Sequence, residues 1–204
     1  PQHFGMPEEF NDLSLKQLQG ILDQIPVLNR VVLHGIGESL MNRALPDIVA
    51  ATKAKGAYTL FNSNGTIFPR SKMRRLIAVG LDELRISVDA ASVETYQEIR
   101  GEALFHKIFE NLELLKELKK EMGSDTPRVS LWMTGLQTNI AELPQLVRVA
   151  SDVGIREVYL QRLVTSGRGL ARKDLTLDLD ALSVATMKNE RTLADTSLSL
   201  IEKA

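Results

Sequence analysis

The segment VVLHGIGESLM, residues 31–41, joins an apolar run to two glycines and an acidic residue. Gly35 and Gly37 carry no side chain, so another molecule can approach the backbone closely at these positions. Glu38 follows directly and supplies a carboxylate, which suits a cationic or hydrogen-bond-donating group. A plainer interpretation is that the glycines form a turn and Glu38 caps the next helix. Both interpretations place a polar edge after a strand.

Polar residues also follow four further predicted strands, at the strand ends where α/β proteins bind their ligands. They are Asn62, Ser63, Asn64, Gly65 and Thr66, then Ser87 and Asp89, then Thr134, Gly135, Gln137 and Asn139, and finally Gln161 and Arg162. Ser87 and Asp89 alternate along one strand, so they face the same side of the sheet. Asn64 and Gly65 are also an ordinary turn signal, and Asp89 with Ser92 also fits the start of a helix.

These strand ends favour ligand binding over acid–base catalysis. A proton-transfer enzyme needs a His or Lys with a pKa near neutrality, and a Schiff-base enzyme needs a strand-end lysine. The candidate base is His34, which precedes the glycines, and we interpret it as a residue that bonds to backbone.

Strand and helix patterns alternate along the chain. Apolar runs begin near residues 31, 58, 84, 129 and 157, at intervals of about 26 to 28 residues with one longer interval. Helical spacing of apolar residues occurs between them, over 14–26, 45–56, 72–80, 92–101, 106–123 and 142–154. Ser14 is the expected N-cap of the first helix, and Gly56 and Gly80 end the second and third. This period predicts a parallel α/β sheet, either an open doubly wound sheet or a complete or partial barrel.

The composition indicates one globular domain. The chain has 204 residues, of which 44% are hydrophobic, and a net charge of -1. A near-neutral chain argues against nucleic acid as its partner, and no apolar run is long enough to span a membrane. We therefore expect a cytoplasmic protein. The absence of cysteine excludes disulfides, thiol nucleophiles and cysteine-bound metal within these residues.

The order of motifs resembles the radical S-adenosylmethionine (SAM) superfamily, in the branch that often carries a C-terminal cysteine-rich domain. LHGIGESL is similar to its glycine-rich motif, LFNSNGT to its Thr-Asn-Gly-Thr strand, and LRISVDAASVETYQEIRG to its fourth-strand signature. QTNIAELPQLVRVASDVGIREVYLQRL resembles its fifth and sixth units. The resemblance covers βα units over about residues 14–166. Beyond them, the residue pattern of the sequence predicts a helical segment over about 174–203.

The resemblance implies a partial (βα)6 barrel that binds SAM beside a 4Fe-4S cluster. It assigns SAM binding to two groups of residues: Gly35, Gly37, Glu38 and Asn64, and then Ser87, Asp89, Gln161 and Leu163. Arg100 matches the arginine of the family's Ile-Arg-Gly segment, and we expect Arg100 to anchor the fourth loop. A flavodoxin or ferredoxin would supply electrons, and the substrate would be a peptide or a small molecule. The product of SAM cleavage would be a 5′-deoxyadenosyl radical that abstracts hydrogen from this substrate.

Two departures from the family pattern matter. Ser39 stands where the family usually has proline, so we expect a looser loop. These residues do not contain the CxxxCxxC loop that holds the cluster in the family. When the βα units are counted, this loop and the first strand are expected upstream of Pro1. We therefore expect a truncated core, inactive by itself, whose metal ligands lie outside these residues.

Two other interpretations remain open at this point. The chain could be a degenerate barrel that binds SAM or a peptide without reaction. It could also be a phosphate-binding (βα) enzyme that uses TSGRGLARK, residues 165–173, as its phosphate loop.

Overall fold

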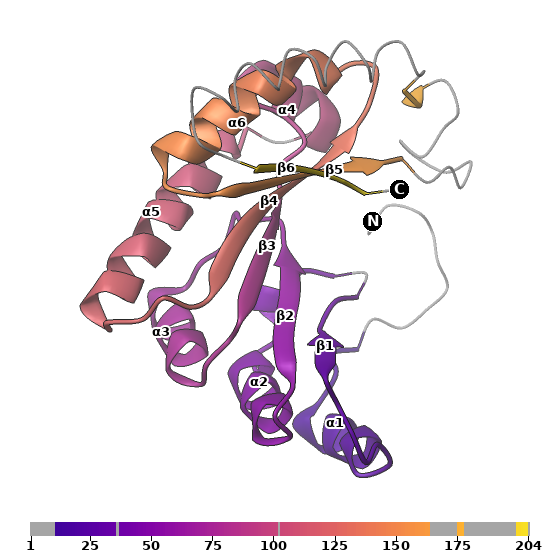
Figure 1. Cartoon of the computed structure of the whole chain (residues 1–204), viewed down its shortest axis with the longest axis vertical. Coiled ribbons are helices and arrows are strands. Elements are labelled where there is room, and N and C mark those ends of the chain that lie inside the picture. The colour runs from indigo at the N-terminus through magenta and orange to yellow at the C-terminus, as the bar shows by residue number, and fades with distance from the viewer. Residues whose placement is uncertain (1–10, 36, 102, 164–174, 178–198, 204) are drawn as a thin grey trace. The chain divides into compact units, whose positions relative to one another are not determined.

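The computed structural model describes residues 11–35, 37–101, 103–163, 175–177 and 199–203 (Figure 1). The strands are β1 (Arg30–Val32), β2 (Tyr58–Ser63), β3 (Glu83–Ser87), β4 (Arg128–Gly135), β5 (Glu157–Arg162) and β6 (Ser199–Lys203). The helices are α1 (Leu15–Leu22), α2 (Leu45–Ala54), α3 (Arg70–Ala78), α4 (Val93–Arg100), α5 (Phe105–Glu121) and α6 (Leu143–Asp152), with 3-10 turns η1 (Ser39–Met41) and η2 (Ile140–Glu142). The predicted alternation of strands and helices is confirmed.

The strand order decides between the two architectures that the periodicity left open. The strands follow one another in the sheet in sequence order, from β1 to β6. A doubly wound sheet has a point where the strand order reverses, whereas a barrel adds each new strand on the same side. The pairs β1–β2, β4–β5 and β5–β6 are parallel, with Val31 opposite Thr59 and Thr134 opposite Gln161. The winding is therefore that of a barrel.

Local signals in the sequence set the helix ends. Ser14 caps α1 through a capping box, in which its hydroxyl accepts from the Gln17 amide and the Gln17 side chain accepts from the Ser14 amide. Ser92 caps α4 in the same position, and α4 ends at Gly101, whose φ of 79° is left-handed. Gly56 follows α2 with a φ of 78°, as its place at a helix end predicts.

The C-terminal prediction differs from the structure. Residues 164–174 and 178–198 lie outside the described residues, and these include most of the expected helix over about 174–203. Residues 199–203 form strand β6, which pairs in parallel with β5. The sequence from Ser197 to Leu200 alternates polar and apolar residues, which is the period of a strand and not of a helix.

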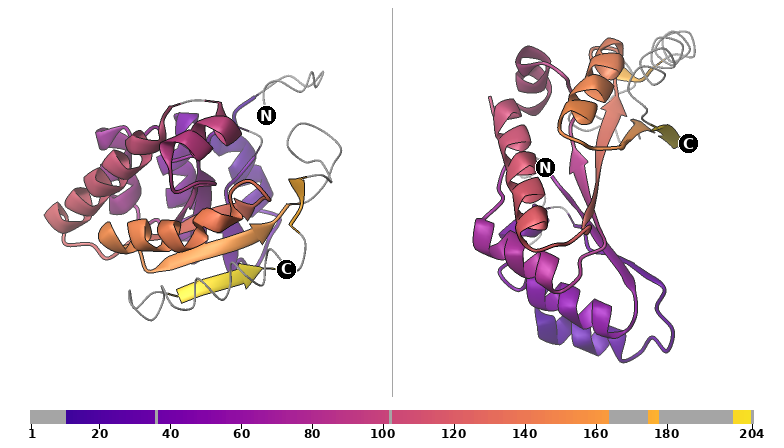
Figure 2. Two further views of the ribbon diagram at one scale, coloured as in Figure 1. Left: turned by 90° about the horizontal axis from the view of Figure 1, so that it is seen from above. Right: turned by 60° about the vertical axis from the view of Figure 1, so that its left-hand side comes forward.

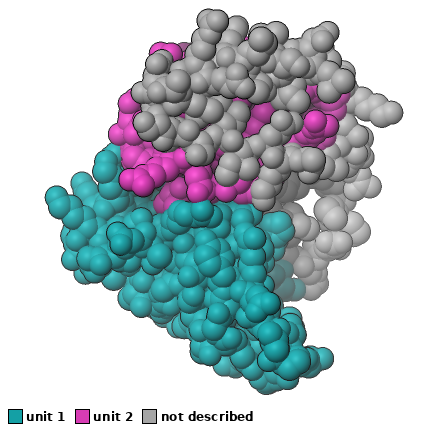
Figure 3. Space-filling view, in the orientation of Figure 1, with its two compact units in different colours: residues 1–85, 111–128 teal, residues 86–110, 129–204 magenta. Residues whose placement is uncertain are grey.

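Contacts divide the chain into two compact units, and we describe each by itself (Figure 3). Unit 1 comprises residues 1–85 and 111–128, and unit 2 comprises residues 86–110 and 129–204. The single domain that the composition indicated stays a prediction. Within the described residues no helix is both long and apolar enough to cross a membrane.

In unit 1, helix α2 contacts β2, α1 and α3 (Figure 2). The hydroxyl groups of Thr52 on α2 and Thr59 on β2 lie 2.8 Å apart, and both residues are fully buried. Leu18 and Leu22 of α1 pack with Ile48 of α2 in an apolar cluster. Burial of each such side chain contributes roughly 1.5–3 kcal/mol to stability.

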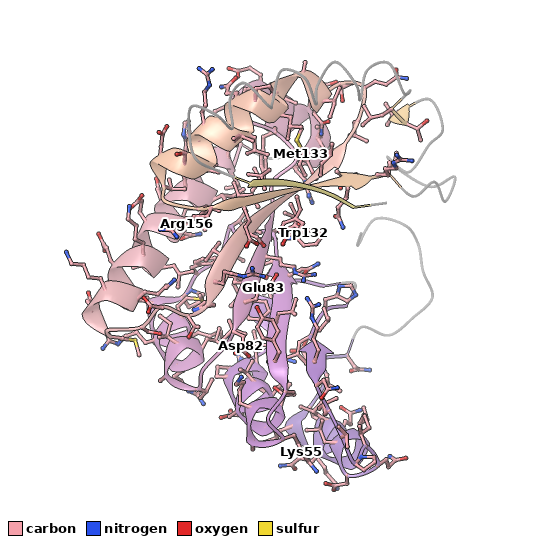
Figure 4. All side chains as sticks on the ribbon, viewed as in Figure 1. Lys55, Asp82, Glu83, Trp132, Met133 and Arg156 are labelled. Atoms are coloured by element: carbon pink, nitrogen blue, oxygen red, sulfur yellow. The ribbon has the colours of Figure 1, made fainter. Side chains whose placement is uncertain are left out.

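A buried carboxylate, Glu83, lies at the start of β3 in unit 1 (Figure 4). It is 1% exposed, and its Oε1 accepts a hydrogen bond of 2.7 Å from Arg85 Nε. Its Oε2 accepts from the Tyr58 hydroxyl at 3.0 Å and from Arg128 Nη2 at 3.3 Å, while Arg30 Nη2 lies 3.9 Å away. Burial opposes ionisation of Glu83, but the Arg85 hydrogen bond and charge and the remaining partners outweigh it and lower the pKa. The carboxylate therefore stays ionised inside unit 1.

Unit 2 has an aromatic pair across β4 and β5. The rings of Trp132 and Tyr159 stack with centroids 4.3 Å apart, and the two residues lie opposite each other in the register. At the end of β4, a Cβ atom added at Gly135 would lie 2.7 Å from Leu177 Cδ1 and 3.1 Å from Leu160 Cδ1. A side chain at this position would have to displace these leucine methyl groups, because the chain itself fills the space.

Candidate functional site

Gly35 and Gly37 follow β1 in unit 1, and neither is explained by the chain around it. Their φ angles lie outside the left-handed region, so the local backbone does not demand glycine. A Cβ atom added at either residue would meet no heavy atom of the described part of the chain within 4 Å. The contrast with Gly135 shows that these two glycines border open space. Such an edge has room for a bound molecule to lie against the backbone.

Glu38 connects this edge to the end of β2. Its Oε2 accepts a hydrogen bond of 2.7 Å from the amide of Asn64, and its Oε1 accepts one of 3.1 Å from the amide of Leu40. Glu38 thus caps η1, which confirms the capping interpretation for a 3-10 turn instead of an α-helix. A carboxylate has about four lone-pair positions, and the described residues occupy two of those of Glu38. The SAM-binding role of Glu38 stays a prediction.

The loop after β1 is held more firmly than the sequence indicated. We expected Ser39, in the place of the family proline, to loosen it. The Ser39 hydroxyl instead donates to the carbonyl of Leu33 at 3.2 Å, and Lys72 donates to the carbonyls of Leu40 and Asn42 at 2.6 and 3.1 Å. The loop is therefore bonded from within and from α3.

Asn64 organises the turn that follows β2. Its Oδ1 accepts from the amide of Thr66 at 2.9 Å and from the Thr66 hydroxyl at 2.8 Å. The carbonyl of Gly65 accepts from Asn111 Nδ2 at 2.8 Å. The turn signal in the sequence is confirmed, and the structure brings Asn64 and Glu38 together as a pair in unit 1.

In unit 2, Asp89 joins the end of β3 to the end of β4. It is 6% exposed, and its Oδ1 accepts a hydrogen bond of 2.7 Å from the amide of Thr134. Its Oδ2 pairs with Arg100, so Arg100 anchors this loop as expected. Asn139 Nδ2 donates to the Asp89 carbonyl at 2.8 Å. Both carboxylate oxygens of Asp89 thus have partners within unit 2, and its role toward SAM stays a prediction.

The other three predicted residues of unit 2 lie at or just beyond strand ends. Ser87 is the last residue of β3, Gln161 lies on β5 opposite Thr134, and Leu163 follows the last residue of β5. All three side chains are half-buried. Their placement agrees with the carboxyl-end positions that the sequence assigned to them.

Glu142 is a carboxylate of this region that the sequence did not single out. Its Oε2 accepts from the amides of Ala91 and Ser92 at 2.6 and 3.2 Å, and its Oε1 accepts from the hydroxyls of Ser92 and Thr95 at 2.6 Å each. Burial raises the pKa of Glu142, but the hydrogen bonds from Ser92, Thr95 and the two amides outweigh burial and lower it. Glu142 therefore fixes the start of α4 in its ionised form.

We expect Glu142→Gln to destabilise the protein by about 1–3 kcal/mol, because four partly buried hydrogen bonds lose their ionised acceptor. Since the folded pKa of Glu142 is lowered, its contribution is complete above the ordinary value of 4.5 and is lost as the pH falls below it. Urea unfolding at pH 7 and pH 4 measures both effects. Glu94→Gln, at an exposed residue of α4, is the control. Equal stability of the two variants at pH 7 would contradict the assigned role.

The described residues fit one of the two cofactors that the family resemblance implies and do not fit the other. The chain contains no cysteine, and among the described residues no group of three His, Cys, Asp or Glu side chains could hold a metal ion. These residues therefore do not fit an iron–sulfur cluster. They do fit one end of SAM, because unit 1 offers open backbone beside a carboxylate. The alternative phosphate loop, residues 165–173, lies outside the described residues.

Comparison with known proteins gives a family match and distant relatives. The model of the Radical SAM superfamily matches residues 3–150. Fe-coproporphyrin III synthase of Methanosarcina barkeri is 26% identical over 172 residues, which are 82% of this chain and 41% of that protein. PqqA peptide cyclase of Granulibacter bethesdensis is 24% identical over 178 residues, or 86% of this chain and 46% of that protein. The chain spans less than half the length of these relatives.

Solved structures show the same fold. SuiB of Streptococcus suis, bound to its precursor peptide SuiA, superposes with a TM-score of 0.73 and 13% identity, over 97% of this chain and 44% of SuiB. A domain of a pyruvate-formate lyase-activating enzyme from Bacteroides vulgatus gives 0.64 with 10% identity, over 86% of this chain and 99% of that domain. The predicted barrel-like α/β fold is confirmed by these similarities.

Proposed function

Because this chain belongs to the radical SAM superfamily, we propose that it is the SAM-binding core of an enzyme that abstracts hydrogen from its substrate. When SAM is bound beside a reduced 4Fe-4S cluster, it supplies a 5′-deoxyadenosyl radical for this abstraction. The cofactor carries this chemistry, while the protein binds, orients and shields it.

The observation that carries the proposal is the glycine edge of unit 1. Gly35 and Gly37 border open space that neither backbone conformation nor packing explains. The Glu38 carboxylate lies next to them in sequence and is held by the amide of Asn64. A fixed carboxylate beside uncovered backbone suits the methionyl ammonium of SAM. Preorganisation of this kind improves binding because little freedom is lost when the ligand arrives.

The other residues that the family resemblance assigns to SAM lie in unit 2. Ser87 and Gln161 offer neutral hydrogen-bonding groups for the ribose and adenine, and Leu163 offers apolar surface. Asp89 holds the end of β4 through Thr134, so we propose that it acts on SAM largely by fixing this loop. The 4Fe-4S cluster would take its cysteines from outside these 204 residues, and a flavodoxin or ferredoxin would reduce it.

The relatives' names do not favour one substrate class for this chain. They include a peptide cyclase and a synthase of an iron porphyrin, and SuiB was solved with a precursor peptide. The proposal is therefore hydrogen abstraction from a peptide or a small organic molecule.

Production of 5′-deoxyadenosine tests the proposed function. We expect the full-length protein, reconstituted anaerobically with iron and sulfide and reduced with dithionite, to convert SAM to methionine and 5′-deoxyadenosine. Chromatography of the reaction mixture measures both products, and omission of dithionite is the control. A reconstituted protein that carries the cluster but neither binds nor cleaves SAM would contradict the proposal.

A further inference from the structure

One buried polar atom at the end of β2 has no partner. Oδ1 of Asn62 is buried and makes no hydrogen bond, and it is the only such side-chain atom in the part of the chain that the structure describes. Folded proteins rarely leave a buried acceptor unpaired, because it loses its bond to water and gains nothing in return. The missing partner of Asn62 therefore points to a molecule that is not part of these residues.

Two buried asparagines, Asn111 and Asn139, show what a structural role looks like in this protein. Asn111 donates through Nδ2 to the carbonyl of Gly65 at 2.8 Å. Asn139 donates to the carbonyls of Asp89 and Thr134 and accepts from the amide of Leu136 at 2.7 Å. Both amides are used to hold loops. The Asn62 oxygen has no comparable task.

The alternation of β2 fixes the side to which Asn62 points. Thr59 faces helix α2, where its hydroxyl meets that of Thr52. Successive side chains of a strand point to opposite faces, so Asn62 shares its face with Tyr58 and not with Thr59. Asn62 as a whole is only half-buried, whereas Phe61 and Ser63 on the helix-covered face are buried. Its amide is therefore directed away from the helices.

Asn62 also belongs to the same edge of unit 1 as the glycines. It precedes Asn64 by two residues, or about 7 Å along the strand, and the Asn64 amide is bound to Glu38. A molecule the size of SAM that lies against Gly35 and Gly37 and meets the Glu38 carboxylate can therefore also reach Asn62.

We propose that Asn62 is a further ligand-binding residue, whose Oδ1 accepts a hydrogen bond from an N–H or O–H group of SAM. This inference rests on the proposed function, and it adds a residue that the family motifs do not assign. The donor belongs either to the methionyl half of SAM, as its ammonium, or to the nucleoside half, as a hydroxyl or the adenine amino group.

Two variants of the full-length, reconstituted protein test the inference by calorimetric titration with SAM. Asn62→Leu removes the acceptor and lowers SAM affinity about tenfold, the equivalent of about 1.4 kcal/mol. Asn62→Asp keeps an acceptor in the same place and retains the affinity within about threefold. Separate titrations with methionine and with 5′-deoxyadenosine assign the donor, because Asn62→Leu weakens only the half that it contacts.

Thermal unfolding without ligand separates a binding role from a structural one. Asn62→Leu leaves the melting temperature unchanged or raises it, because it removes an unpaired polar atom. The matched variant Asn111→Leu lowers the melting temperature, since it breaks the bond to Gly65. If Asn62→Leu lowers it as much, or binds SAM as tightly as the wild type, the inference is overturned while the proposed function stands. A wild-type protein that binds no SAM overturns both.

Discussion

Gly35→Val is expected to weaken SAM binding by about ten- to hundredfold and to leave the melting temperature of the protein unchanged. A Cβ atom at this position meets no atom of the described residues within 4 Å, and the backbone lies outside the left-handed region. Valine therefore fits the protein but occupies the space proposed for the ligand. Calorimetric titration with SAM and thermal unfolding of the reconstituted full-length protein measure the two effects.

Gly135→Val is the matched control, because the chain itself fills the space beside this glycine. The added atoms collide with Leu177 and Leu160, so the melting temperature falls. The two variants thus separate a glycine kept for a ligand from a glycine kept for packing. Unchanged SAM affinity in Gly35→Val would show that the ligand does not approach this edge.

Glu83→Gln is expected to lower the free energy of unfolding by about 3 kcal/mol, which is the lower end of the range for breaking a buried ion pair. Arg85 has a side chain only 13% exposed, and the Glu83 carboxylate that it contacts at 2.7 Å becomes neutral. The side chains of Arg128 and Arg30 are 49% and 51% exposed and stay solvated, so they add little. For a chain of this size, the loss corresponds to a fall in melting temperature of roughly 6–12 °C.

The pH dependence of stability provides a second test of Glu83. Its folded pKa is lowered, so its contribution is complete above the ordinary value of 4.5 and is lost as the pH falls below it. The difference in unfolding free energy between the wild type and Glu83→Gln should therefore shrink on acidification. Glu121→Gln is the control, because Glu121 also contacts two arginines but is 43% exposed, and its loss costs less than about 1 kcal/mol. Equal effects of the two substitutions would contradict the assigned role of Glu83.

The fold was predictable because its signals are local. Apolar runs and helical spacing identified five strands to within a residue or two, and Ser14 and Gly56 marked helix ends through interactions with their near neighbours. The choice between a barrel and a doubly wound sheet was not predictable from period alone. Strand order depends on which strands meet, and each βα unit has the same pattern in both folds.

The candidate site was predictable only in part, for the same physical reason. Strand-end positions drew attention to Glu38 and Asp89, but their partners Asn64 and Thr134 lie 26 and 45 residues away. Glu142 reaches donors about 50 residues distant, and no spacing rule connects it to them. Asn62 stood among the polar strand-end residues, yet only the structure reveals that its oxygen has no partner. Long-range hydrogen bonds leave no periodic trace in a sequence.

The division of the chain bears on the order in which the protein is synthesised. Unit 1 is made of residues 1–85 and 111–128, and the first stretch of unit 2 lies between them. At translation rates of about 5–20 residues per second, the ribosome synthesises the first stretch of unit 2 before the second stretch of unit 1. No single break in the polypeptide can separate one unit from the other. A nascent chain that stops before residue 111 lacks the second stretch of unit 1, so neither unit can finish folding before its neighbour has begun to emerge.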